Sequence, residues 1–203
     1  MFKGNLFAIP NKTITKMKYL IFSILFLGLI SSCENNATQT NSDSAPEKVT
    51  KKKPLSPPES SMAMIGDAHI HIDYSSPGVR GRTIFGDLIP FNELWRAGAN
   101  KATWIETNKD LEVGGQSLPA GKYGIFAIPN KEKWTIVFNT RWEQHGTDKY
   151  SEKEDVFRID VTPATLEKIQ EHLEYKVIKS DEQSGIISLA WEKTKVEIPF
   201  KLK

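Results

Sequence analysis

The stretch "AHIHIDY", residues 68–74, carries the side chains of the chain that are best suited to chemistry. His69, His71 and Asp73 alternate with isoleucines, which is the period of a β-strand. Alternate residues of a strand lie about 7 Å apart on one face. Two histidines placed in this way can share a metal ion if another segment completes the ligand set.

A second segment, "RWEQHGTDKY", supplies His145 and Asp148. We predict that His69, His71, His145 and Asp148 hold a divalent transition metal, with zinc, copper, nickel and iron as candidates. Any functional site is expected where the histidine-bearing strand face meets this loop. The alternative is that the histidines are ordinary polar residues on a half-solvated sheet face.

A ligand site is also predicted from arginine and tryptophan side chains near these segments. Arginine fits carboxylate or phosphate groups, and tryptophan offers a flat surface for a small molecule or glycan. In the alternative interpretation, the arginines bind loop carbonyls and the aromatic rings close the end of a core. The predicted ligand-binding residues are Arg80, Arg82, Trp95, Arg96 and Trp142.

The rest of the sequence argues against several classes of function. The net charge is +2, which gives no reason to expect a nucleic-acid partner. The chain lacks a G-x-S-x-G motif and a phosphate-binding loop with a Lys-Ser/Thr ending. We therefore favour binding over catalysis.

The single cysteine, Cys33, follows a basic region, an apolar run and two serines in "KMKYLIFSILFLGLISSC". This order is typical of a secretory signal, and the run is shorter than the ~20 residues of a spanning helix. Ile30 to Cys33 resembles a bacterial lipobox, which implies lipidation of Cys33. Residues 1–33 are therefore predicted to be a signal peptide, with Met17 as an alternative start. A plain signal peptide with an incidental cysteine is the other interpretation.

Residues 34–61 are polar and broken by prolines, and we predict a disordered linker there. Residues 62–203 are predicted to form an antiparallel, jelly-roll-like β-sandwich, because short alternating runs are separated by turns. Its core is expected to contain Ile70, Ile72, Trp134, Ile136, Phe138, Phe157, Ile159, Leu189 and Trp191. One helix is predicted over "ATLEKIQEHL", where Pro163 stands at the first turn.

Several segments together resemble the bacterial domain-of-unknown-function family 2911. They are "IDYSSPGVRGRTIFGDLIPFNELWRAGANKAT", "LPAGKYGIFAIP", "WTIVFN", "DVFRIDV" and "ISLAWEKTKVEIPF". The resemblance implies a β-rich domain that is secreted or lipid-anchored, and it transfers no catalytic residue. The predicted helix is an insertion relative to the usual short link of the family.

The sequence thus predicts an exported protein, anchored by lipid in the bacterial cell envelope and facing the periplasm or the cell surface. Its domain is expected to bind a small molecule, a glycan or a protein partner. A metal-dependent enzyme that uses the histidines is the alternative, and a purely structural role in the envelope is a third interpretation.

We expect Cys33→Ser to abolish lipid attachment, because the acyl chains require the cysteine thiol. The measurement is incorporation of a labelled fatty acid, together with the distribution of the protein between membrane and soluble fractions. The wild-type chain is the control. A Cys33→Ser protein that is still labelled and membrane-bound would contradict the anchor.

Overall fold

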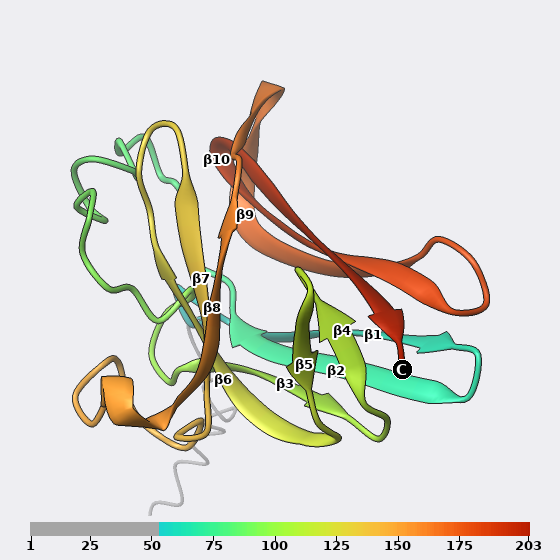
Figure 1. The fold of residues 1–203 in the computed structure, drawn as a ribbon. Helices are drawn as coiled ribbons and strands as arrows, with labels where there is room; N and C mark the ends of the chain where they lie inside the picture. The colour runs from blue at the N-terminus through green and yellow to red at the C-terminus, as the bar shows by residue number, and fades with distance from the viewer. Residues whose placement is uncertain (1–52) are drawn as a thin grey trace, which may run out of the picture. The chain divides into compact units, whose positions relative to one another are not determined.

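The computed structural model describes residues 53–203, which form two antiparallel sheets packed face to face (Figure 1). The first, six-stranded sheet has the order β1 (Pro58–Ile65), β2 (Ala68–Ser75), β3 (Thr103–Thr107), β6 (Gly121–Ile128), β7 (Trp134–Asn139), β8 (Asp155–Val161). The second, four-stranded sheet has the order β5 (Gln116–Leu118), β4 (Leu111–Val113), β10 (Ser184–Leu202), β9 (Ala164–Lys179). The predicted mostly-β sandwich is confirmed.

Cys33 and the predicted signal segment lie outside the described residues. Within residues 53–203, no helix is long and apolar enough to cross a membrane.

Period-two alternation places one face of each strand in the core between the sheets. In β2, Ala68, Ile70, Ile72 and Tyr74 are buried, whereas the residues between them are half-buried. The predicted core residues lie in this core, and all are buried except Phe157, which is partly buried and packs on Phe138 at 5.0 Å between ring centroids.

The long connection from β2 to β3 closes one end of the sandwich with aromatic rings. Trp95 stacks on Trp191 with 5.9 Å between the ring centroids, and the ring centroid of Phe85 lies 4.7 Å from that of Trp134. The backbone of Trp95 exchanges two hydrogen bonds with Ala127 of β6, both at 2.8 Å. The connection therefore contributes buried side chains to the core, whereas other residues of it, such as Arg80, are exposed.

The predicted helix over residues 164–173 is wrong, because this segment forms the first part of β9. Its leucine, glutamate and lysine residues favour a helix locally, but long-range pairing decides the outcome. β9 pairs with β10 over most of its length. On its other side, the carbonyl of Glu171 accepts a hydrogen bond from Val79 N, and Leu173 N donates to the carbonyl of Pro77.

The predicted boundary between linker and domain is also displaced. Residues 58–61 of the predicted linker lie in β1, which pairs with β2 from Pro58↔Ser75 to Ile65↔Ala68. The polar character of this segment misled the prediction, because an edge strand tolerates exposed polar side chains.

Candidate functional site

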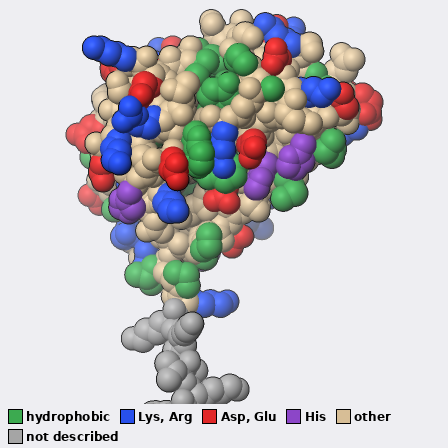
Figure 2. Space-filling view, turned by 90° about the horizontal axis from the view of Figure 1, so that it is seen from below, with side chains coloured by type: hydrophobic (Ala, Val, Ile, Leu, Met, Phe, Trp, Pro, Cys, Tyr) green, Lys and Arg blue, Asp and Glu red, His purple; other side chains and the backbone are tan. Residues whose placement is uncertain are grey.

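The outer face of the six-stranded sheet, which is the face turned away from the core, carries the predicted histidines. Because Ile70, Ile72 and Ile105 point inward, His69 and His71 of β2 and Trp104 of β3 point outward. Seen from below, the molecule shows histidine side chains at separate places, with basic, acidic and apolar side chains between them (Figure 2).

A row of rings joins this face to the loop of residues 140–151, called the β7–β8 loop below. The ring centroids of His71 and Trp104 are 5.1 Å apart, and those of Trp104 and Trp142 of the loop are 6.1 Å apart. Trp104 of β3 therefore links the histidine-bearing strand to the loop.

Lys122 of β6 fixes the two tryptophans relative to each other. Its Nζ lies 3.3 Å from the centroid of Trp104 and 4.0 Å from that of Trp142. Such cation–π contacts contribute about 0.5–1 kcal/mol each at exposed sites. Lys122 does not line the adjacent cleft, so its ammonium group holds the rings without filling that space.

The cleft has a volume of about 370 Å³ and is here called the tryptophan cleft. It combines two indole rings with two lysine ammonium groups, one imidazole and one carboxylate. Its lining residues are Lys101, Ala102, Trp104, Trp142, Glu143, Gln144, His145 and Lys149.

Backbone hydrogen bonds hold the β7–β8 loop against the segment that precedes β3. Ala102 N donates to the carbonyl of Gln144 at 3.0 Å, and Gly146 N donates to the carbonyl of Asn100 at 2.9 Å. The buried side chain of Gln144 closes the loop on itself by donating to the carbonyl of Arg141 and accepting from Lys149 N.

A second, smaller core lies beneath the loop. Phe126 and Val137, on the outer face of β6 and β7, are fully buried, and Tyr150 of the loop packs against them. Gly124 permits this close approach, because a Cβ there would lie 2.8 Å from the Phe126 ring and 3.3 Å from Trp142 Cα. Any larger residue at position 124 would push the loop outward.

Asp155, at the start of β8, fixes the far end of the loop. Its carboxylate, with a side chain that is 10% exposed, accepts hydrogen bonds from Asn139 Nδ2 at 2.7 Å, Tyr150 Oη at 2.9 Å and Arg158 Nε at 2.8 Å. Burial, followed by the hydrogen bond to Asp155, raises the pKa of Tyr150 to about 12.

The four predicted metal ligands form two separate pairs. The rings of His69 and His71 are 6.0 Å apart on β2, whereas His145 Nδ1 lies 3.9 Å from Asp148 Oδ2 on the loop. Within residues 53–203, no group of three or more His, Cys, Asp or Glu side chains is placed to hold a metal ion. The sequence pattern identified the segments but could not fix the distance between them.

Of the predicted ligand-binding residues, only Trp142 lines the tryptophan cleft, and the others lie elsewhere in the structure. Trp142 lines the tryptophan cleft, but Trp95 is 4% exposed and belongs to the core. Arg82 donates to the carbonyls of Val79 at 3.0 Å and Gly78 at 2.6 Å, as the alternative interpretation expected. The exposed Arg80 lies on the same connection, with its backbone N bound to Glu171.

Arg96 lies close to the loop and is only half-buried. Its Nε is buried without a hydrogen-bond partner among residues 53–203. Burial lowers the pKa of Arg96, and the nearby negative charge of Asp148 opposes this effect. Arg96 does not line the cleft, and the Asp148 carboxylate offsets part of its positive charge.

Sequence reasoning missed Trp104, Lys122, Lys101 and Lys149 as components of the site. The alternation in "KATWIET" does place Trp104 and Glu106 on the face opposite Ile105, so the signal for Trp104 was present. The lysines are recognisable only once the strand order puts β6 beside β3 and the loop beside residue 101.

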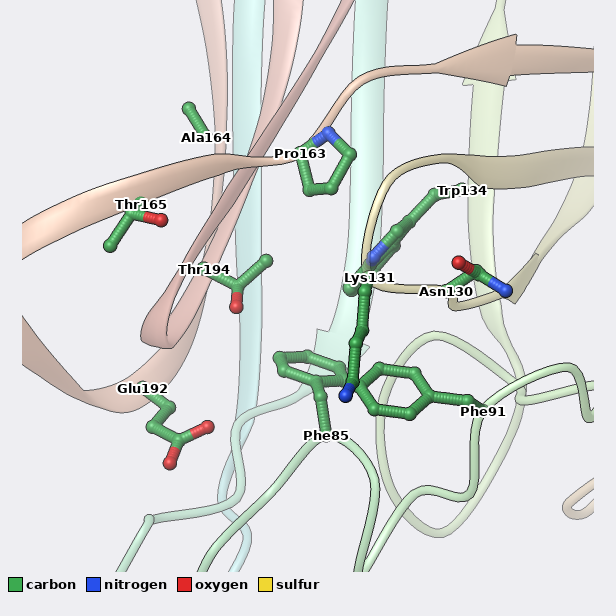
Figure 3. A pocket seen from close by; sticks show the side chains of 10 residues that line it. All are labelled: Phe85, Phe91, Asn130, Lys131, Trp134, Pro163, Ala164, Thr165, Glu192 and Thr194. Carbon is green, nitrogen blue, oxygen red and sulfur yellow. The ribbon is translucent and has the colours of Figure 1, made fainter.

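A second cavity, of about 170 Å³, lies between the β2–β3 connection and the bulged part of β10 (Figure 3). Phe85, Phe91 and Trp134 form its aromatic side, and Lys131 Nζ lies 6.0 Å from the Phe91 ring. This cavity is less than half the size of the tryptophan cleft, and its aromatic wall continues the core cluster. We therefore treat the cleft as the candidate site.

Comparison with known protein families places residues 56–200 in the family described as Protein of unknown function (DUF2911), to which the chain therefore belongs. No curated protein and no solved structure matches the chain.

The raised pKa of Tyr150 predicts a loss of stability at high pH. Its phenol ionises near pH 10.0 in the unfolded chain and near pH 12 in the fold. The stabilisation is therefore complete below pH 10 and disappears as the pH rises through about 12. Tyr150→Phe removes this group and should cost about 1.5–3 kcal/mol at neutral pH.

The measurement is the free energy of urea unfolding of the wild type and of Tyr150→Phe across this range. The difference between them should shrink as the pH rises from 10 to about 12. Because the other tyrosines titrate in both proteins, they cancel in the difference. A difference that stays constant would show that the Tyr150 hydroxyl does not stabilise the loop.

Proposed function

We propose that the domain is a binding module whose tryptophan cleft takes an acidic saccharide or a comparable ring-bearing anion. The observation that carries the proposal is the combination, in one cleft of about 370 Å³, of two indole rings and two lysines. Neither lysine has an ion-pair partner among residues 53–203.

The aromatic side of the cleft suits a ring. Trp104 and Trp142 meet at an interplanar angle of 63°, so their rings present two differently oriented surfaces. The C–H face of a sugar or the plane of an aromatic acid can pack on such surfaces, which combine apolar area with an N–H donor. Trp142 is half-buried and supported from below, which limits the entropy that it loses on binding.

The charges around the cleft suit an anionic group. Within residues 53–203, Lys101 and Lys149 take part in no ion pair, in contrast to Arg141, which is paired with Glu154 at 2.6 Å. Lys122 lies nearby against the Trp142 ring, and Glu143 is the one acidic residue in the lining. The net positive charge favours a carboxylate or sulfate on the ligand.

The setting of the cleft favours binding over catalysis. The side chains of His145 and Asp148 are 72% and 74% exposed and 3.9 Å apart. Catalytic acids and bases are usually held in partly buried surroundings, whereas this pair lies in solvent.

The position of the domain in the cell forms part of the proposal. The lipobox-like sequence ending at Cys33 supports export and attachment to the membrane by lipid. A domain tethered at the envelope would meet acidic saccharides of the cell surface or its surroundings.

The test is a fluorescence titration with a disaccharide that contains glucuronic acid, with a neutral glucose disaccharide as the control ligand. Trp95, Trp134 and Trp191 are at most 4% exposed, so a saturable change should report the cleft. Trp142→Ala should weaken binding at least tenfold, which corresponds to about 1.4 kcal/mol. His172→Ala, in β9 of the other sheet, should bind like the wild type.

A double variant, Lys101→Gln with Lys149→Gln, separates charge from stacking. It should lose the preference for the acidic disaccharide while the rings remain. Equal affinity of the wild type for the acidic and neutral sugars, unchanged affinity in Trp142→Ala, or no saturable response would contradict the proposal.

A further inference from the structure

Two methionines stand beside the two histidines at the exposed edge of the six-stranded sheet. Met62 and Met64 of β1 are 57% and 53% exposed, so their side chains are accessible from solvent. The strand register places Met62 directly opposite His71 and Met64 directly opposite His69. In Figure 2, histidine and hydrophobic side chains lie next to each other at one side of the face.

All four side chains point to the same side of the sheet. In β1, Ser61, Ala63 and Ile65 point inward, since Ala63 and Ile65 pack in the core and Ser61 Oγ accepts a hydrogen bond from Val177 N of β9. Met62 and Met64 therefore share the outer face with their partners. Directly opposed residues have Cβ atoms about 4.5–5.5 Å apart, so their side chains can reach a common ion.

The two histidine rings are spaced so that an ion fits between them, and one ring nitrogen has no hydrogen-bond partner among residues 53–203. The two ring centroids are 6.0 Å apart, which leaves room for an ion between the rings. His71 Nε2 is buried without a hydrogen-bond partner among residues 53–203. An unsatisfied buried polar atom of this kind is destabilising, and bonding to an ion would remove that cost.

The chemistry of the four donors selects the ion. Glu106 opposes His71 on its other side, in β3, but within residues 53–203 no third His, Cys, Asp or Glu joins a metal-binding group. The remaining neighbours are thioethers, which are soft ligands. Thioether sulfur with imidazole nitrogen suits Cu(I), whereas Mg²⁺ and Ca²⁺ require oxygen ligands.

We propose that Met62, Met64, His69 and His71 bind one Cu(I) ion on the outer face of β1 and β2. The site uses the two histidines of β2 but neither His145 nor Asp148, which remain paired with each other on the loop. It is separate from the tryptophan cleft, whose lining includes none of the four residues.

The test is Cu(I) binding by the full chain, in competition with the chromophoric chelator bathocuproine disulfonate under anaerobic, reducing conditions. The protein carries Cys33→Ser, so that its one thiol does not bind the ion, and is kept in a non-ionic detergent. We expect one Cu(I) per chain. Met62→Leu with Met64→Leu should weaken binding at least tenfold, and His71→Ala should weaken it at least as much.

The methionine variant is decisive because both side chains are exposed, so that leucine at these positions leaves the fold intact. His145→Ala is the matched control and should bind Cu(I) like the parent protein. X-ray absorption of the copper-loaded parent should show scattering from sulfur that the double methionine variant lacks. Absence of competitive Cu(I) binding by the parent, or equal binding by the double methionine variant, would overturn the proposal.

Discussion

The carboxylate of Asp155 is the group on which the shape of the outer face depends. It lies at the junction of β7, the β7–β8 loop and β8, and it accepts hydrogen bonds from a side chain of each: Asn139, Tyr150 and Arg158. With its side chain only 10% exposed, this carboxylate would be costly to leave unpaired. The network therefore holds the loop in one position, and the loop carries Trp142 to the sheet.

The six-stranded sheet is apolar on both faces for part of its width, and this explains where the cleft forms. Over β6 and β7 the outer face carries Phe126 and Val137, which the loop covers. Over β2 and β3 the same face carries His69, His71 and Trp104, which no segment of residues 53–203 covers completely. The tryptophan cleft lies at the border of the part of the sheet that the β7–β8 loop covers. The proposed copper site lies on β1 and β2, at the edge of the sheet.

Local patterns predicted most of the strands and most of the core, because the alternation in segments such as "AHIHIDY" indicates which residues are buried. They missed β1, whose first residues are polar and fall in the predicted linker. They failed at residues 164–173, where helix-favouring residues pair with β10 and with the β2–β3 connection, which no local signal reveals. The candidate site could be predicted only in part, because its arrangement also depends on long-range strand pairing. Its segments could be identified, but Trp104 as the link and the separation of His71 from His145 follow from strand order.

The most direct test of this account is hydrogen exchange in Asp155→Asn compared with the wild type. The amides of Ala102 and Gly146 donate to the carbonyls of Gln144 and Asn100, so they report whether the loop is docked. We predict that both amides exchange at least tenfold faster in the variant, while the amides of β2 and β3 keep their protection. Unchanged exchange at Ala102 and Gly146 would show that Asp155 does not hold the loop, and would contradict the account.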